Sequence, residues 1–157
     1  KVIQDGEMVG FDTDMVGPDR YCADNSRSFV VDNKFNEEQK KLYSMAIEQI
    51  DYNSKLIKNG MAFKEFVEKS WVLPQEYYPN RYSVMVHGIG LCDEWPAIRY
   101  PDDGGERTGV FKKNMTITVE SYIGKVKGKE GVKLEQQYLV GENGLELMSH
   151  HPLEDIK

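Results

Sequence analysis

The sequence predicts an α+β fold in which helices pack against antiparallel β-hairpins. Apolar residues recur at spacings of three and four between residues 36 and 60, as in an amphipathic helix. Segments before and after that helix have strand patterns and are joined in pairs by turn residues, as in hairpins. The chain has 157 residues, of which 39% are hydrophobic and 29% charged, so it has the size of one globular domain with its own core.

The first hairpin is predicted to join two strands, residues 8–15 and 20–31. Asp12 and Asp14 are two residues apart and therefore share one face of the first strand. A turn centred on Pro18 sets Asp12 opposite Asp24, so that three acids converge. Like charges that face each other on a sheet destabilise it unless a cation lies between them. Taken singly, each aspartate is also compatible with a solvated position at a strand end.

Two helices are predicted after this hairpin. Asn36 opens an Asn-Glu-Glu-Gln capping box, and the helical pattern that follows is expected to end near Gly60. A second helix over residues 62–71 stops before Pro74, because proline cannot continue a helix. Both helices have charged outer faces and apolar inner faces, so we interpret them as packing elements rather than binding elements.

A buried strand over residues 84–86 leads directly to His87. Gly88 and Gly90 leave room for another group to approach the backbone there, and the acidic pair Asp93-Glu94 follows. A lone histidine beside glycines is usually a hydrogen-bonded core or loop residue. The acids elsewhere in the chain favour a functional role instead.

A second pair of acids is predicted near the end of the chain. Strands are expected over residues 115–126 and 132–140, with a return strand over residues 145–148. In a simple hairpin Glu120 and Glu135 lie opposite each other, since their midpoint falls between Lys127 and Gly128 in a glycine-rich turn.

Two pairs of carboxylates on two hairpins, together with one histidine, can hold two divalent metal ions. The positive charge of the ions would offset acids that otherwise repel one another. A set of mostly oxygen ligands with a single imidazole suits iron, manganese, cobalt or zinc, and the sequence does not choose among them.

The overall charge argues against several partners. The chain has 20 basic and 26 acidic residues, a net charge of -6, which disfavours nucleic acid and anionic membrane surfaces. No apolar run approaches the roughly 20 residues that span a bilayer, and no signal peptide is evident. Cys22 and Cys92 do not make a disulfide framework, so we expect reduced thiols and a cytoplasmic location.

The order of these residues resembles the pita-bread metallopeptidase superfamily, which includes methionine aminopeptidases, proline-specific peptidases and creatinases. The resemblance rests on His-Gly-Ile-Gly at His87, Thr-Ile-Thr-Val-Glu-Ser around Glu120 and Val-Lys-Leu-Glu-Gln-Gln around Glu135. It implies the C-terminal part of a pita-bread (creatinase/aminopeptidase) fold, a curved antiparallel sheet with packing helices. Residues 1–157 would then be a single catalytic domain fragment that lacks the N-terminal helical domain and the first half of the catalytic fold. Members usually form homodimers.

The resemblance also implies roles for the candidate ligands. Asp24 and Glu135 would bridge two metal ions, Asp14 would complete one site with Asp12 as a further candidate, and His87 and Glu120 would complete the other. These assignments are implied by the family pattern alone.

The chain departs from the peptidases at one informative place. Peptidases of this superfamily carry a second histidine seven residues after the metal histidine, but here that position is Glu94, preceded by Asp93. This stretch is similar to dimethylsulfoniopropionate lyases of the DddP type, in which the matching aspartate is the catalytic base. The similarity implies cleavage of a small sulfonium carboxylate to dimethyl sulfide and acrylate, and it favours iron. Tyr82 and Trp95 are the local aromatic candidates for holding the sulfonium cation.

Two other functions remain open at this point. The chain could belong to a dinuclear metal-dependent Xaa-Pro peptidase or a related amidohydrolase that uses metal-bound water, or it could be a non-catalytic metal-binding relative. Release of dimethyl sulfide, cleavage of Xaa-Pro peptides, or neither would distinguish the three.

Overall fold

The computed structural model describes residues 1–105 and 108–153. Two helices and seven strands form in the following order: β1 (Met8–Val16), β2 (Cys22–Val30), α1 (Glu37–Leu56), α2 (Phe63–Lys69), β3 (Val84–Gly88), β4 (Ala97–Arg99), β5 (Thr116–Gly124), β6 (Gly131–Val140) and β7 (Leu145–Leu147). Short 3-10 turns occur at Val31–Asn33, Tyr78–Asn80 and Pro101–Asp103. None of the described helices combines the length and the apolarity needed to cross a bilayer.

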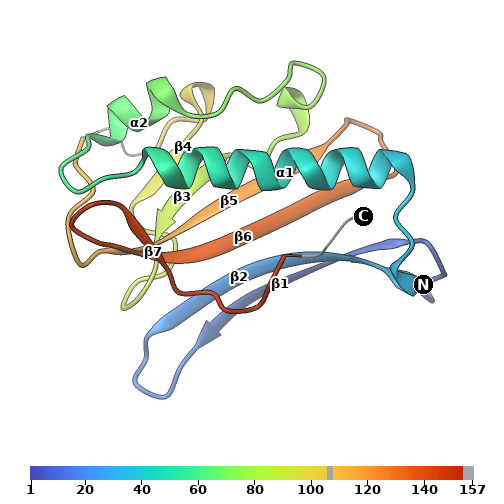
Figure 1. Ribbon diagram of the computed structural model, residues 1–157, viewed down its shortest axis with the longest axis horizontal. Helices are drawn as coiled ribbons and strands as arrows, with labels where there is room; N and C mark the ends of the chain where they lie inside the picture. The colour runs from blue at the N-terminus through green and yellow to red at the C-terminus, as the bar shows by residue number, and fades with distance from the viewer. Residues whose placement is uncertain (106–107, 154–157) are drawn as a thin grey trace.

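The elements are arranged in layers (Figure 1). A five-stranded sheet has the order β4-β3-β5-β6-β7, and every neighbouring pair in it is antiparallel. Helix α1 lies along one side of β5 and β6, and the two-stranded β1-β2 hairpin lies on their other side. The predicted α+β architecture with antiparallel strands and packing helices is therefore confirmed. Strands β5 and β6 are thus covered from both sides.

Strand β5 shows how this layering divides the side chains. The Ser121 hydroxyl donates a hydrogen bond to Oε1 of Gln49 on α1 at 2.6 Å, so the odd-numbered residues of β5 face the helix. Ile117 on that face is buried in the main apolar core. Glu120 belongs to the opposite face, which the hairpin covers, and it too is buried. One strand thus supplies the core on one side and the candidate site on the other.

Helix α1 begins as predicted and ends earlier than predicted. The Asn36 side chain accepts from the backbone N–H of Gln39, and the Gln39 side chain accepts from the backbone N–H of Asn36, which completes the capping box. The expected end near Gly60 is wrong, because the helix stops at Leu56 and the next residue, Ile57, turns to an extended conformation. The Ile57 side chain is fully buried there, so core packing ends the helix before the glycine.

The first hairpin differs in register from the sequence prediction. Asp14, not Asp12, lies opposite Asp24, and Asp12 lies opposite Ser26. The turn is centred one residue later than expected, and its Gly17 N–H donates to the Tyr21 carbonyl at 2.7 Å. When the centre of the turn moves by one residue, the residue opposite any given position changes by two. Asp12 and Asp14 therefore still share the face on which they were predicted.

The second hairpin has the predicted register, with Glu120 directly opposite Glu135. The short strand β4, which pairs with β3, was not predicted, because three residues are too few to show a period of two. Strand β3 pairs with β5 on its other side, which brings the end of β3 that carries His87 next to Thr118. The histidine and the two glutamates are therefore on three consecutive strands of the sheet, β3, β5 and β6.

Candidate metal centre

The β1-β2 hairpin is fixed against the large sheet by contacts between β2 and β6. The Ser28 hydroxyl donates to the Lys133 carbonyl at 2.9 Å, and the Lys133 backbone N–H returns a bond to the same hydroxyl at 3.0 Å. The Ser26 hydroxyl lies within hydrogen-bond distance of both Asp12 and Glu135, at 2.9 Å from Oε2 of the glutamate. These contacts set the acids of the first hairpin opposite those of the second.

His87 lies at the middle of the acids that converge here. Its Nε2 is 3.1 Å from Oε1 of Glu135, 3.6 Å from Oδ2 of Asp24 and 3.7 Å from Oε1 of Glu120. All four residues are at most 4% exposed. The other ring nitrogen, Nδ1, is 3.0 Å from the Gly88 carbonyl, which can only accept. A proton on Nδ1 would leave Nε2 as the nitrogen that faces the acids.

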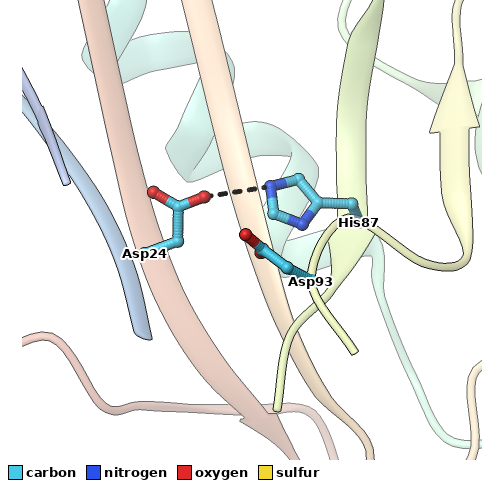
Figure 2. A group of neighbouring side chains, drawn as sticks. All are labelled: Asp24, His87 and Asp93. Atoms are coloured by element: carbon cyan, nitrogen blue, oxygen red, sulfur yellow. Dashed lines mark ion pairs between the residues drawn. The ribbon is translucent and has the colours of Figure 1, made fainter. Parts of the chain in front are cut away.

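Asp93 reaches the same place from the segment after β3. In Figure 2 its carboxylate points toward His87, six residues before it, and toward Asp24 of the distant strand β2. Three overlapping groups each offer ligand atoms within 4.8 Å of one another: Asp24, His87 and Asp93; His87, Glu120 and Glu135; Asp12, Asp24 and Glu135. Because the groups share members, they form one centre.

We refer to one set of predicted residues as the acidic centre, namely Asp12, Asp14, Asp24, His87, Glu120 and Glu135. The structure brings these residues together. Asp14 is outside the three tight groups but lines the same cavity and faces Asp24 across the hairpin. The cavity has a volume of about 550 Å³, and Tyr82 is among the residues that line it. Trp95 is 61% exposed and is not among the described residues that line this cavity.

The acids of the centre repel one another, and their pKa values show it. Burial raises the pKa of Asp24 to about 8, and the neighbouring charges of Glu135 and Asp14 add to that rise. Burial also raises the pKa of Glu120 to about 7, with Glu135 again contributing. The protein around Asp24 and Glu120 therefore does not fully stabilise the negative charge of these two carboxylates.

His87 and Glu135 have the opposite character. Burial opposes the charge of His87, but the contact with Glu135 and the charge of Glu120 outweigh it and raise its pKa to about 9. Burial likewise opposes the charge of Glu135, but the hydrogen bond from His87 and the charge of Lys133 lower its pKa to about 2. A protonated histidine and an ionised glutamate form a buried ion pair here.

The residues of the acidic centre fit divalent metal ions. Two buried oxygen atoms, Oδ1 of Asp24 and Oε1 of Glu120, accept no hydrogen bond from any residue within the described ranges. Buried carboxylate oxygens without a partner are costly in a protein interior, and a cation would satisfy them. Carboxylates with one imidazole are also a suitable donor set for first-row transition metals.

Lys133 is a further member of the site that sequence reasoning did not identify. Its Nζ lies 2.9 Å from Oε2 of Glu120 and 3.3 Å from Oδ2 of Asp12. It also lies 4.7 Å from the centre of the Tyr82 ring, as in a cation–π contact. Glu120 and Glu135 raise the pKa of Lys133 against the effect of its burial, which keeps the ammonium charged. Its position two residues before Glu135 on one strand was the available signal.

Lys133→Met is expected to lower the thermal stability of the metal-free chain. The ammonium group is the positive charge nearest to Glu120, and its loss leaves that buried carboxylate with only the more distant His87 to offset its charge, at a cost of about 3 kcal/mol or less. Divalent metal should recover most of the loss, whereas Lys133→Arg should show little loss because it keeps the charge. Thermal unfolding by circular dichroism, with and without metal, measures both. Equal stability of Lys133→Met and the unsubstituted chain without metal would contradict this role.

The metal-free chain is also expected to lose stability between about pH 5 and pH 9. Asp24, Glu120 and His87 all have raised pKa values, so the folded chain binds more protons than the unfolded chain in this range. The stability that accompanies a raised pKa is present below the unfolded value and is lost as the pH passes through the folded value. The unfolding midpoint in a chelator should fall by about 5 °C or more, and added divalent metal should reduce the fall. A thermal unfolding midpoint that rises with pH over this range would contradict the prediction.

The fold and the site together define a class of protein. Carboxylates from two hairpins that surround a histidine, on an antiparallel sheet covered by helices, are the arrangement of pita-bread metalloenzymes. The chain belongs to metallopeptidase family M24, whose family profile matches residues 1–142.

Relatives in this family include both lyases and peptidases. The chain is 35% identical over 158 residues to the dimethylsulfoniopropionate lyase DddP of Roseovarius nubinhibens, which covers 98% of this chain and 35% of that protein. It is 32% identical over 149 residues to the Xaa-Pro dipeptidase of Pyrococcus furiosus, which covers 92% of this chain and 40% of that protein. The chain thus spans well under half the length of the curated relatives it matches.

Solved structures of peptidases have the same fold. The Xaa-Pro dipeptidase from Bacillus anthracis superposes with a TM-score of 0.80 at 26% identity, covering 98% of this chain and 42% of that one. The prolidase from Pyrococcus horikoshii gives a TM-score of 0.79 at 25% identity, covering 98% of this chain and 43% of that one. These similarities confirm the pita-bread fold expected from the sequence.

Proposed function

We propose that this chain carries the catalytic centre of a metal-dependent lyase that cleaves dimethylsulfoniopropionate to dimethyl sulfide and acrylate by base-catalysed β-elimination. The main support is the position of Asp93, whose carboxylate lies within 4.8 Å of ligand atoms of His87 and Asp24. The 35% identity to a protein named as such a lyase points to the same chemistry. The substrate is then a small sulfonium carboxylate.

The acidic centre would hold two divalent metal ions. Asp24 and Glu135 would bridge them, Asp14 would complete one site with Asp12 as a further ligand, and His87 and Glu120 would complete the other. Iron is favoured by the resemblance, and zinc, manganese or cobalt also suit the donor set. When bound, the ions would act as Lewis acids for the negative charge that develops on the substrate carboxylate.

Asp93 would act as the base. Its carboxylate would take the proton from the carbon next to the substrate carboxylate, and the electron pair of that C–H bond would form the C=C bond of acrylate. The C–S bond would break with its electron pair going to the sulfur, which neutralises the sulfonium cation. Dimethyl sulfide leaves as a neutral molecule, so the leaving group needs no acid. This agrees with a glutamate, Glu94, at the position where peptidases have a second histidine.

Tyr82 and Trp95 would hold the sulfonium group against their aromatic faces. The Tyr82 ring already receives one cation, the ammonium of Lys133, at 4.7 Å from its centre. Its hydroxyl lies 3.5 Å from Oε1 of Glu94, a contact that would orient the ring. Trp95 lies in the same exposed segment as Asp93 and would close over the substrate from there.

We further propose that residues 1–157 provide one catalytic unit and that other parts of a longer protein complete the substrate pocket. This proposal rests on the coverage of the relatives, which is 35% for the lyase and 40% for the dipeptidase. A homodimer is proposed by resemblance to the family, and light scattering during gel filtration would test it.

The second candidate function is that of a dinuclear Xaa-Pro peptidase or related amidohydrolase, favoured by the 32% identity to an Xaa-Pro dipeptidase. Assays of the purified, metal-loaded protein distinguish the candidates. Dimethyl sulfide release measured by gas chromatography, without cleavage of Xaa-Pro dipeptides, is the result expected of the lyase. Peptide cleavage without dimethyl sulfide would favour the peptidase. Metal binding with neither activity would favour a non-catalytic metal-binding relative.

A further inference from the structure

Two free thiols, Cys22 and Cys92, are distant in sequence but belong to segments that contact each other in the fold. Cys92 directly precedes the proposed base, Asp93. Cys22 is the first residue of β2, and its backbone N–H donates to the Gly90 carbonyl at 2.7 Å. Cys22 is two residues before Asp24 on the same strand, so their side chains share the face that is turned toward the large sheet. Cys92 is two residues after Gly90 and directly precedes Asp93.

The segment that carries Cys92 is held at its start and is exposed beyond it. Ile89 donates its backbone N–H to the Thr116 carbonyl at 3.1 Å, and the contact of Gly90 with Cys22 holds the next residue. Residues 91–95 are all exposed, with Leu91 at 75%. Little packing therefore opposes a local shift of Cys92.

The chain length between Gly90 and Cys92 allows a disulfide after a local shift. Two residues span at most about 7 Å, so Cys92 cannot lie far from the place where Gly90 contacts Cys22. A disulfide requires a Cα–Cα separation of roughly 4.4–6.8 Å. The hydrogen bond between Cys22 and Gly90 therefore anchors the segment only two residues before Cys92.

We propose that Cys22 and Cys92 form a reversible disulfide that ties the Asp93 segment to β2 when a low-molecular-weight disulfide is present. The Cys92 thiolate, being exposed, would attack one sulfur of the small disulfide, whose S–S bond breaks and releases one thiolate. The Cys22 thiolate would then attack the Cys92 sulfur of the mixed disulfide and release the second. The two protons lost by the cysteines neutralise the two released thiolates, so the protein is oxidised by two electrons and the small disulfide is reduced.

This crosslink would bear on the proposed function through Asp93, which follows Cys92 directly. A tethered segment restricts where the Asp93 carboxylate can move, so the thiol state would regulate access to the base. That consequence rests on the proposed lyase. The disulfide itself does not, because its formation needs neither metal nor substrate and is measured without any activity assay.

The test is incubation of the reduced protein with glutathione disulfide at neutral pH, followed by intact mass measurement and peptide mapping. The expected product is lighter by two hydrogen atoms, contains one peptide pair joined through Cys22 and Cys92, and returns to the starting mass on addition of dithiothreitol. Cys22→Ser and Cys92→Ser serve as matched variants, and each should instead retain one glutathione on its remaining thiol.

Three results would overturn the inference. They are glutathione on one or both thiols of the unsubstituted protein without an internal crosslink, disulfides formed only between two chains, and no modification at all. A chain that forms the internal disulfide yet releases no dimethyl sulfide in either state would support the redox pair and count against the lyase, so the two proposals fail separately.

Discussion

Asp93→Asn is expected to lower the rate of dimethyl sulfide release about a thousandfold, the usual scale for loss of a general base. Asparagine keeps the shape of the side chain but cannot take the substrate proton. Asp93 is exposed, whereas His87 and Asp24 are buried, so this substitution leaves the packing of the acidic centre unchanged. Metal content, measured by mass spectrometry of the dialysed protein, should stay the same while the rate measured by gas chromatography falls.

Glu94→Gln is the matched control for this experiment. Glu94 is the adjacent carboxylate, lines the same cavity and lies 3.5 Å from the Tyr82 hydroxyl. If it only orients the ring, its substitution should cost much less activity than that of Asp93. Retained activity in Asp93→Asn, or an equal loss in both variants, would show that Asp93 is not the base.

The register of the second hairpin shows what the sequence can predict. Glu120 and Glu135 face each other as expected, because the side-chain period of a strand is two and the turn between them lies at their midpoint. In the first hairpin, Asp12 and Asp14 share one strand face as predicted, but Asp24 lies opposite Asp14 and not Asp12. Its turn closes between Gly17 and Tyr21, and the length of a turn depends on such backbone contacts more than on the residues beside it.

Contacts between distant segments were beyond the reach of local patterns. The packing of β2 against β6 depends on hydrogen bonds from Ser28 and Arg27. Arg27 is buried and donates to the Glu135 carbonyl and to Oε1 of Gln136. These residues are more than a hundred positions away from their partners. The role of Lys133 could not be predicted for a related reason, since it depends on contacts with Glu120 and Asp12, which lie on other strands. The end of α1 was also set by burial, at Ile57, rather than by its glycine.

Glu135→Gln is expected to lower metal affinity more than about a hundredfold. Removing a residue that only holds a metal ligand in place already lowers metal affinity by up to about a hundredfold, and a ligand itself should contribute more. Glu135 contacts His87 at 3.1 Å and Ser26 at 2.9 Å, and it belongs to two of the three groups of converging ligand atoms. A residue shared in this way would contribute to both ions, so its substitution should remove both. Equilibrium dialysis with metal analysis measures the affinity and the number of ions bound per chain.

The control for this substitution is Glu146→Gln, which makes the same change at an exposed position on β7 and should leave metal binding unchanged. Circular dichroism of Glu135→Gln distinguishes a lost ligand from a lost fold, since glutamine has nearly the same volume and can still accept from Ser26. A folded Glu135→Gln protein that binds two ions with unaltered affinity would show that Glu135 is not shared between them. A different residue of the acidic centre would then have to be shared between the two ions.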